Sequence, residues 1–191
     1  VLLLLTGTLF ASAPVSAQPS FGPTRNLQID AALQEDNDAA AKLATDGAGN
    51  WVGVWYTAVP GHPDVEVRTA RSADNGCTWS APQYLNVDFA TDGVHDYFPD
   101  VATDGAGLWI AAWNKNVQTV VARSTDNGLT WSAPVVISSM SSSTGVIGAI
   151  VYGLGAWVVT WTDATSVRVA RSTNGGLTWS APVSVNSSAC C

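Results

Sequence analysis

Two short stretches of the chain carry a concentration of aromatic and acidic side chains. The first runs from Tyr56 to Val65 and the second from Asp88 to Tyr97. Aromatic rings offer flat apolar faces for stacking, and carboxylates and imidazoles hydrogen-bond to hydroxyl groups. The candidate ligand-binding residues are therefore Tyr56, His62, Asp64, Asp92, His95, Asp96 and Tyr97. A neutral glycan is the ligand whose hydroxyl groups and ring faces suit this set.

The acids of the second stretch can also be weighed as catalysts or metal ligands. Asp92 and Asp96 lie in one predicted loop with His95, where a desolvated carboxyl would serve as a general acid. Loop acids are more often solvated, so no catalytic residue is predicted. The spacing Asp88, Asp92, Asp96, Asp100 lacks the alternating ligands of a calcium loop, so neither a metal nor a cofactor is predicted.

The overall composition limits the classes of partner. With 47% hydrophobic and 12% charged residues, the chain is expected to fold into one domain. A net charge of −7 with only eight lysines and arginines excludes nucleic acid, because phosphate contacts need clustered cations. Anionic membrane surfaces are disfavoured for the same reason.

Three similar segments must position the candidate loops. SADNGCTWSAP begins at Ser72, STDNGLTWSAP at Ser124 and STNGGLTWSAP at Ser172, at spacings of 52 and 48 residues. Upstream of each segment lies a Gly-rich turn and a stretch with two tryptophans four residues apart. All nine tryptophans of the chain belong to this scheme. The chain is therefore built from three repeats.

Each repeat is predicted to contain four β-strands. In the second repeat these are 100–103, 108–114, 119–124 and 134–138, separated by Gly-rich turns. Tryptophans four apart would share a face on a helix too, but short length, flanking glycines and β-branched residues favour strands. A β-sandwich is the alternative, yet it would not need the same turn in every repeat. The prediction is an all-β propeller with three four-stranded blades and an orphan strand, part of a six-bladed or similar ring.

The pattern Ser-x-Asp-x-Gly-x-x-Trp resembles the Asp-box, or BNR repeat, of sialidase-like β-propellers. It matches Ser72–Trp79 and Ser124–Trp131 in full, whereas Ser172–Trp179 carries Asn174 in place of Asp. The Asp is expected to accept backbone N–H groups in a tight turn, the Gly to take a positive φ, and the Trp to cap the blade core. The predicted structural residues are Ser72, Asp74, Gly76, Trp79, Ser124, Asp126, Gly128, Trp131, Ser172, Asn174, Gly176 and Trp179.

Sialidase activity, as the resemblance implies it, needs three arginines for the substrate carboxylate, an Asp acid/base and a Tyr nucleophile with a Glu partner. The expected Arg-Ile-Pro motif is missing, and Arg71, Arg123 and Arg171 belong to the repeat, towards the opposite face. The chain is expected to be a secreted sialidase-like segment that recognises a glycan or acts as a scaffold, without a complete catalytic set. The alternative is a fragment of an exo-sialidase-like glycoside hydrolase whose catalytic residues lie in further blades.

The ends of the chain carry their own predictions. Residues 1–17 are expected to be a signal peptide, because a short apolar run precedes small residues, and 18–25 a linker. The propeller region spans 26–187, with an orphan fourth strand and loop at 26–38, blades at 39–87, 88–138 and 139–187, and a tail at 188–191. The protein is expected to be secreted, periplasmic or extracellular, free of the membrane after signal removal. Its protein partners are expected to be further blades or a second copy.

Overall fold

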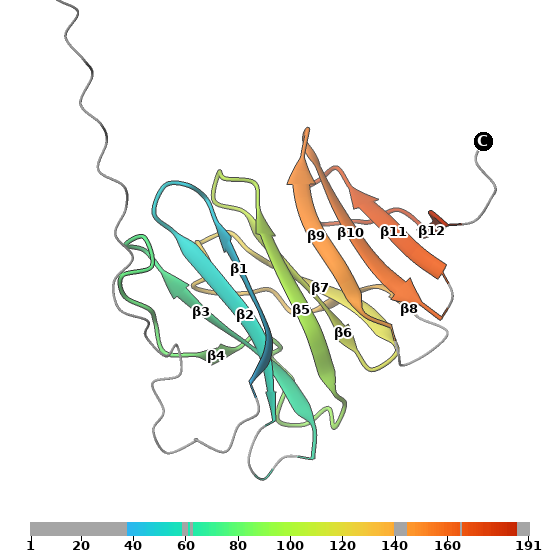
Figure 1. Cartoon of the computed structure of the whole chain (residues 1–191), viewed down its shortest axis with the longest axis horizontal. Helices are drawn as coiled ribbons and strands as arrows, with labels where there is room; N and C mark the ends of the chain where they lie inside the picture. Colours follow the sequence, from blue (N-terminus) through green and yellow to red (C-terminus); the bar gives the residue numbers. More distant parts are fainter. Residues whose placement is uncertain (1–37, 59–60, 62, 140–144, 165, 187–191) are drawn as a thin grey trace, which may run out of the picture.

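Three antiparallel β-sheets stand side by side in the computed structural model, which describes residues 38–58, 61, 63–139, 145–164 and 166–186 (Figure 1). We call the sheets blades 1 to 3. Blade 1 contains β1 (Ala39–Thr45), β2 (Trp51–Ala58), β3 (Val65–Ser72) and β4 (Gln83–Tyr84). Blade 2 contains β5 (Asp96–Thr103), β6 (Trp109–Lys115), β7 (Gln118–Ser124) and β8 (Val135–Ser139). Blade 3 contains β9 (Ile147–Gly153), β10 (Ala156–Asp163), β11 (Ser166–Ser172) and β12 (Val183–Ser184).

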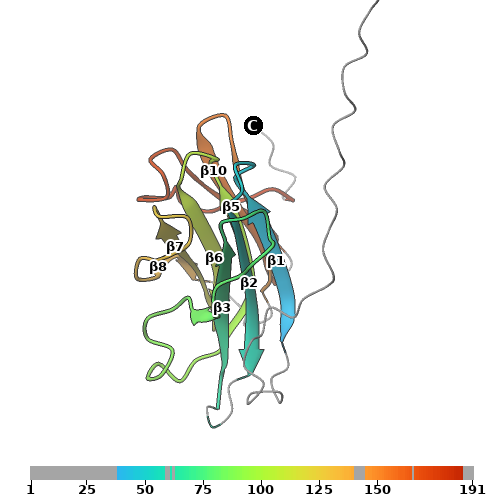
Figure 2. The same cartoon turned by 90° about the vertical axis from the view of Figure 1, so that its left-hand side faces the viewer.

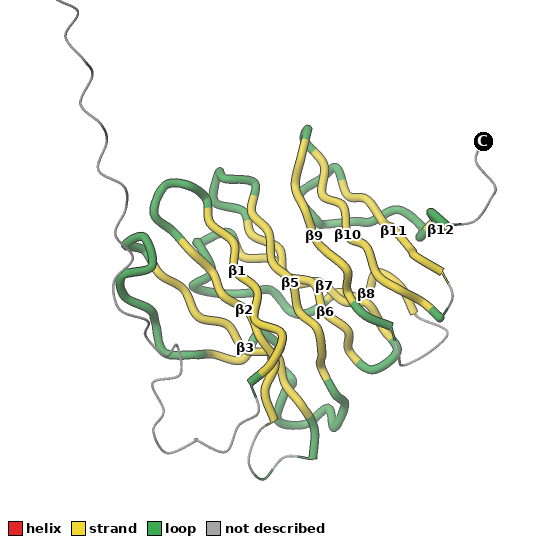
Figure 3. The backbone as a smooth tube through the Cα atoms, in the orientation of Figure 1, coloured by secondary structure: helices red, strands yellow, loops and turns green. Residues whose placement is uncertain are grey.

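In each blade the strands pair in chain order, each antiparallel to the next. The first strands of neighbouring blades adjoin one another, β1 beside β5 and β5 beside β9 (Figures 1 and 2). Strands and connecting loops account for all of the described chain, which contains no helix that could cross a membrane (Figure 3). The predicted all-β architecture of four-stranded blades is confirmed.

The middle blade shows why the second strands are apolar on both faces. Side chains alternate across a strand, so Trp109 and Trp113 of β6 pack in a core shared with blade 1. Ile110 and Ala112 point the other way, into a core shared with blade 3 that contains Trp157. Each inter-blade space is thus filled by both sheets, which explains the nearly continuous apolar run of β6.

The box turns also fix how closely the blades approach. A Cβ atom added at Gly128 of the second box would lie 2.6 Å from Cγ2 of Val52, which belongs to blade 1. One added at Gly176 of the third box would overlap Ile110 of blade 2. Both glycines also have φ of +77°, a conformation that L side chains rarely adopt. The glycine of a box therefore serves its own turn and the packing of the preceding blade.

In each box turn the Ser, the Asp or Asn and the Thr hydrogen-bond to one another. In the second box, Ser124 Oγ donates to Asp126 Oδ1 at 2.8 Å, and the backbone N–H of Gly128 donates to Ser124 Oγ at 2.9 Å. Thr130 donates its N–H to Asp126 Oδ1 and its hydroxyl to Oδ2, at 2.9 and 2.5 Å. Asn174 Oδ1 accepts the equivalent Ser and backbone bonds in the third box, at 2.9 and 3.0 Å.

The predicted loops began too early or ended too late at two places. Tyr56 was expected in a loop but lies in β2, which continues to Ala58. Asp96 and Tyr97 were expected in the loop before the strand at 100–103, but β5 already begins at Asp96. The strand is interrupted by a bulge between Tyr97 and Asp100, where Phe98 has a positive φ of 51°. A bulge leaves its extra residue unpaired, and the pairing with β6 holds on both sides of it, Tyr97 opposite Asn114 and Asp100 opposite Ala112.

Several predicted segments lie outside the described residues. They are the signal peptide, the linker, the orphan strand and its loop up to residue 37, and the tail at 188–191.

Candidate functional site

The candidate site lies at the end of the blades opposite the boxes. A box joins the third and fourth strands, so the loops from second to third strand, and from fourth strand to the next blade, emerge at the other end. We call these the box end and the loop end. At the loop end, blade 1 contributes Asp64 and Glu66, the connection from blade 1 to blade 2 contributes Asp88 and Asp92, and β5 of blade 2 contributes Asp96. These five carboxylates form the acidic cluster.

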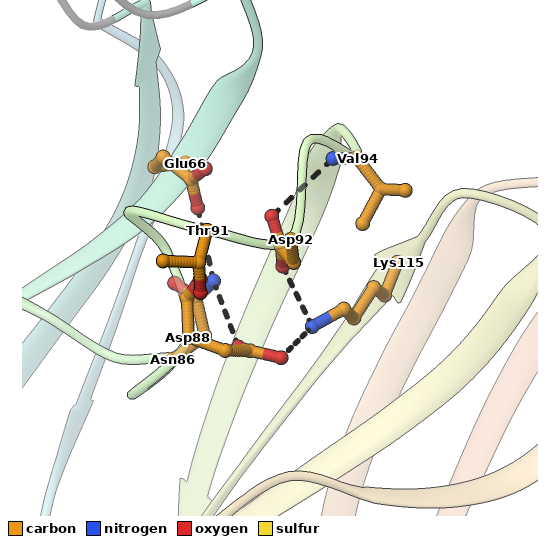
Figure 4. A network of polar contacts seen from close by, with 7 residues as sticks. All are labelled: Glu66, Asn86, Asp88, Thr91, Asp92, Val94 and Lys115. Atoms are coloured by element: carbon orange, nitrogen blue, oxygen red, sulfur yellow. Dashed lines mark hydrogen bonds and ion pairs between the residues drawn. The ribbon is translucent and has the colours of Figure 1, made fainter.

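Lys115, at the end of β6, pairs with one side of the acidic cluster. Its Nζ lies 2.5 Å from Asp88 Oδ2 and 2.7 Å from Asp92 Oδ2 (Figure 4). Asp92 Oδ1 also accepts the backbone N–H of Val94 at 3.3 Å. The lysine is therefore engaged by two carboxylates, and the loop that holds Asp92 is fixed to blade 2.

Glu66 is one of two fully buried acids of the cluster. Its side chain is 0% exposed, and its Oε2 accepts a hydrogen bond from Asn86 Nδ2 at 3.0 Å (Figure 4). Burial raises the pKa of Glu66 to about 8, and the negative charges of Asp96, Asp92 and Asp64 add to this effect. At neutral pH, Glu66 therefore holds a proton unless a cation is present.

Asp96 begins β5 and is also 0% exposed. Burial raises its pKa to about 7, while the charge of Lys115 and the indole of Trp113 partly offset the shift. A buried carboxyl cannot touch a sugar in this conformation. Both strongly shifted acids are therefore parts of the interior.

Four rings lie beside the acidic cluster, and we call them the aromatic edge: Tyr56, His95, Tyr97 and Phe98. Tyr56 meets Tyr97 and Phe98 edge to face, with ring centroids 5.5 and 5.7 Å apart. His95 stacks on Tyr97 at 5.2 Å. The backbone N–H of Val65 donates to His95 Nδ1 at 3.1 Å, which ties the ring to blade 1. The rings are half-buried, except His95, which is exposed.

The structure brings together six of the seven predicted ligand-binding residues. Tyr56, His95 and Tyr97 form most of the aromatic edge, and Asp64, Asp92 and Asp96 belong to the acidic cluster. The seventh, His62, lies outside the described residues. Whether they bind a ligand stays a prediction.

Sequence reasoning missed Glu66 and Asn86. Glu66 lies six residues before Ser72, and the same position holds Gln118 in blade 2 and Ser166 in blade 3. A carboxylate between two valines of a buried strand is a signal that alignment of the three repeats would have given. Asn86 lies 14 residues after Ser72, and Asn186 holds the same position after Ser172, so the alignment of the repeats would have marked it too.

Three arginines of the blades have contacts with other parts of the protein. Arg68 lies over the ring of Tyr84, 4.9 Å from its centroid. Arg123 donates from Nε to the carbonyl of Gly175 in the next box at 2.5 Å. Arg168 Nε lies 3.8 Å from Asp163 Oδ2. These contacts hold the arginines within or between blades.

Comparison with known proteins found one related sequence and several similar structures. No protein-family model matches the chain. A sialidase of Bacteroides fragilis (strain YCH46) is 30% identical over 54% of this chain and 25% of its own length. Hadza microbial sialidase Hz136 superposes with a TM-score of 0.57 at 20% identity, over 74% of this chain and 36% of that chain. Penicillium chrysogenum alpha-L-arabinanase complexed with arabinobiose gives 0.61 at 16% identity, over 77% and 49%.

The matches cover only part of each known protein. The chain spans a quarter of the curated sialidase and between a third and a half of the two solved structures. The structural matches are under 25% identical, so they show the fold alone.

Proposed function

Because the chain has the fold of a sialidase-like β-propeller, we propose that it is a segment of a secreted propeller protein that binds a neutral glycan. The aromatic edge is the binding surface, and this segment does not hold a complete catalytic set. The observation that carries the proposal is the group of rings at the loop end, next to acidic side chains, in which His95 stacks on Tyr97 and Tyr56 meets Tyr97 edge to face. Such partly exposed rings beside hydrogen-bonding groups match the faces and hydroxyls of a sugar.

Charge argues for a neutral sugar over sialic acid. A bound carboxylate needs fixed cationic donors, ideally bidentate arginines. The cation that contacts the acidic cluster is Lys115, and it is already paired with Asp88 and Asp92. An anionic sugar at the aromatic edge would therefore be repelled by the neighbouring carboxylates.

Burial argues against catalysis by the shifted acids. A general acid must come within hydrogen-bond reach of the glycosidic oxygen. Glu66 and Asp96 are each 0% exposed. They therefore stabilise or shape the loop end and do not protonate a substrate there.

The second candidate is a part of a sialidase-like glycoside hydrolase whose catalytic residues lie in further blades. The likeness to the Bacteroides fragilis sialidase, of which this chain matches a quarter, favours it. The two candidates agree on a glycan and on further blades or a second copy as partners. They differ in the sugar and in turnover.

Calorimetric titration of the full chain tests the proposal, with arabinobiose as the neutral probe and sialyllactose as the anionic one. We expect arabinobiose to bind, and Tyr97→Ala to weaken its affinity about tenfold. The matched control is Tyr152→Ala, since Tyr152 is a 40% exposed ring packed on Trp157 at the box end. We expect this variant to bind like the parent.

A fluorogenic sialoside assay completes the test. We expect no turnover by the full chain. Sialoside turnover, or tighter binding of sialyllactose than of arabinobiose, would overturn the proposal in favour of the second candidate. If the Tyr97 and Tyr152 variants lose arabinobiose affinity equally, the aromatic edge is not the binding site.

A further inference from the structure

We propose that Asp64, Glu66 and Asp92 form a binding site for a divalent cation, with calcium as the ion that fits best. The site would join blade 1 to the connection that leads into blade 2. It was not predicted from the sequence, and it does not depend on glycan binding.

Geometry is the first argument. One carboxylate oxygen from each of the three residues lies within 4.8 Å of the others. Calcium binds oxygens at about 2.3–2.6 Å, so opposed ligands lie about 5 Å apart. A single ion between the three carboxylates can therefore contact all of them.

Unpaired buried oxygens are the second argument. Asp64 is 5% exposed and Glu66 is 0% exposed. Asp64 Oδ1 and Glu66 Oε1 have no hydrogen-bond partner within the described part of the chain. Of the two oxygens of Glu66, Asn86 contacts Oε2 and not Oε1 (Figure 4). A buried carboxylate oxygen without a partner is costly, and a cation at this position would satisfy both.

The distribution of charge is the third argument. Lys115 contacts Asp88 and Asp92, on the blade 2 side of the acidic cluster. Asp64 and Glu66 of blade 1 form no ion pair in the described structure. A divalent ion between Glu66, Asp64 and Asp92 would compensate the negative charge on the blade 1 side of the acidic cluster, which Lys115 does not contact.

The donor chemistry selects the ion. All three side chains offer carboxylate oxygen, which suits calcium and magnesium and disfavours zinc or copper. Magnesium demands near-ideal octahedral geometry at about 2.0–2.1 Å, whereas calcium accepts irregular sets of six to eight oxygens. Glu66 comes from strand β3 and Asp92 from the connection between two blades, so the ligands form an irregular set. Water and backbone carbonyls would complete the coordination.

Terbium luminescence and thermal unfolding of the full chain, both after treatment with chelator, test the proposal. Terbium serves as a calcium probe that emits when nearby tryptophan is excited. We expect terbium emission that added calcium displaces, and a melting temperature that rises in about 1–5 mM CaCl2, the concentration that weak extracellular sites need. An equal concentration of MgCl2 should raise the melting temperature less.

Glu66→Gln is the decisive variant, because blade 2 has Gln118 at the same strand position and the change keeps the side-chain shape. We expect it to lose at least ten-fold in calcium affinity, and Asp64→Asn to do the same. Asp126→Asn is the matched control, since it removes a carboxylate at the box end. It should respond to calcium like the parent.

Two results would overturn the proposal. The first is a parent chain that shows neither emission nor a shift in melting temperature up to 10 mM calcium, which would mean that protons alone compensate the acidic cluster. The second is an unchanged calcium response in Glu66→Gln, with the melting curve showing that this variant is folded. In that case the ion binds elsewhere.

Discussion

The two ends of the blades handle their polar groups in opposite ways. At the box end, Asp74 accepts the hydroxyl and the N–H of Thr78 at 2.6 and 2.8 Å and the hydroxyl of Ser72 at 2.7 Å. At the loop end, Glu66 is buried with one oxygen satisfied and the other without a partner in the described structure. The Ser, Asp and Thr of the box are satisfied by their own turn, whereas Glu66, at the end where the repeats differ, is only partly satisfied.

The pKa values of the carboxyl groups express the same contrast. Hydrogen bonds from the side chain and backbone of Thr78, and from Ser72, lower the pKa of Asp74 to about 2. Burial raises the pKa of Glu66 to about 8. The box turn therefore favours the charged form of Asp74, and burial at the loop end disfavours the charged form of Glu66. The repeated residues that build the turns and the non-repeated acids of the loop end therefore lie at opposite ends of the blades.

The largest predicted effect tests how tightly the box end is packed. Gly128→Ala should destabilise the protein by about 2–4 kcal/mol, from left-handed backbone strain plus overpacking against Val52. Gly76→Ala has the same kind of backbone, with φ of +79°, but a Cβ there meets nothing nearer than Trp79 at 4.0 Å. It should cost about 1–2 kcal/mol. Urea unfolding of both variants checks this, and equal losses would contradict the inter-blade role of the second box.

The second prediction concerns the pH dependence of the loop end, measured in EDTA. The folded-state pKa of Asp96 is raised to about 7, so its contribution to stability is full below the unfolded value near 3.8. This contribution is lost as the pH rises through 7. Asp96→Asn should therefore gain stability relative to the parent between pH 5 and pH 8, on the order of 1–3 kcal/mol. A constant difference between the two across this window would show that Asp96 is ionised throughout.

The smallest predicted effect is at the box end. Asp126→Asn should cost less than about 1 kcal/mol at pH 7, because Asn174 already makes the equivalent turn in the third box. Its pH dependence has the opposite sign to that of Asp96. Hydrogen bonds from Thr130 and Ser124 outweigh burial and lower the pKa of Asp126. Its stabilisation is therefore lost as the pH falls through the folded pKa, and parent and variant should converge in acid. If urea unfolding at low pH gives different stabilities for parent and variant, the predicted contrast between Asp126 and Asp96 is wrong.

The repeats explain how much of the fold could be predicted from the sequence. Three copies of one turn, each with tryptophans at fixed offsets, specify a blade, and β6 lies within one residue of its predicted bounds. The bulge at Phe98 could not be predicted, because a bulky residue rarely takes a positive φ and Phe is not a turn signal.

The candidate site was predicted less completely than the fold. Tyr56, His95 and Tyr97 could be placed at one end by counting loops, because topology alone brings those loops together. The burial of Asp96, and the proximity of Glu66 and Asp64 to Asp92, depend on how blade 1 packs against blade 2. That packing joins residues that are far apart in the sequence. The spacing of the acids along the chain therefore does not predict it.

The most direct test of the central claim, that ions and sugars act at the loop end, is fluorine NMR of the full chain with 5-fluorotryptophan at its nine tryptophans. Trp113 lies beside Asp96 at the loop end, and Trp131 belongs to the second box of the same blade. Trp113→Phe and Trp131→Phe assign the two resonances. We predict that calcium moves the Trp113 resonance and leaves that of Trp131 unchanged. A shift of Trp131 alone, or no shift of Trp113, would contradict the account.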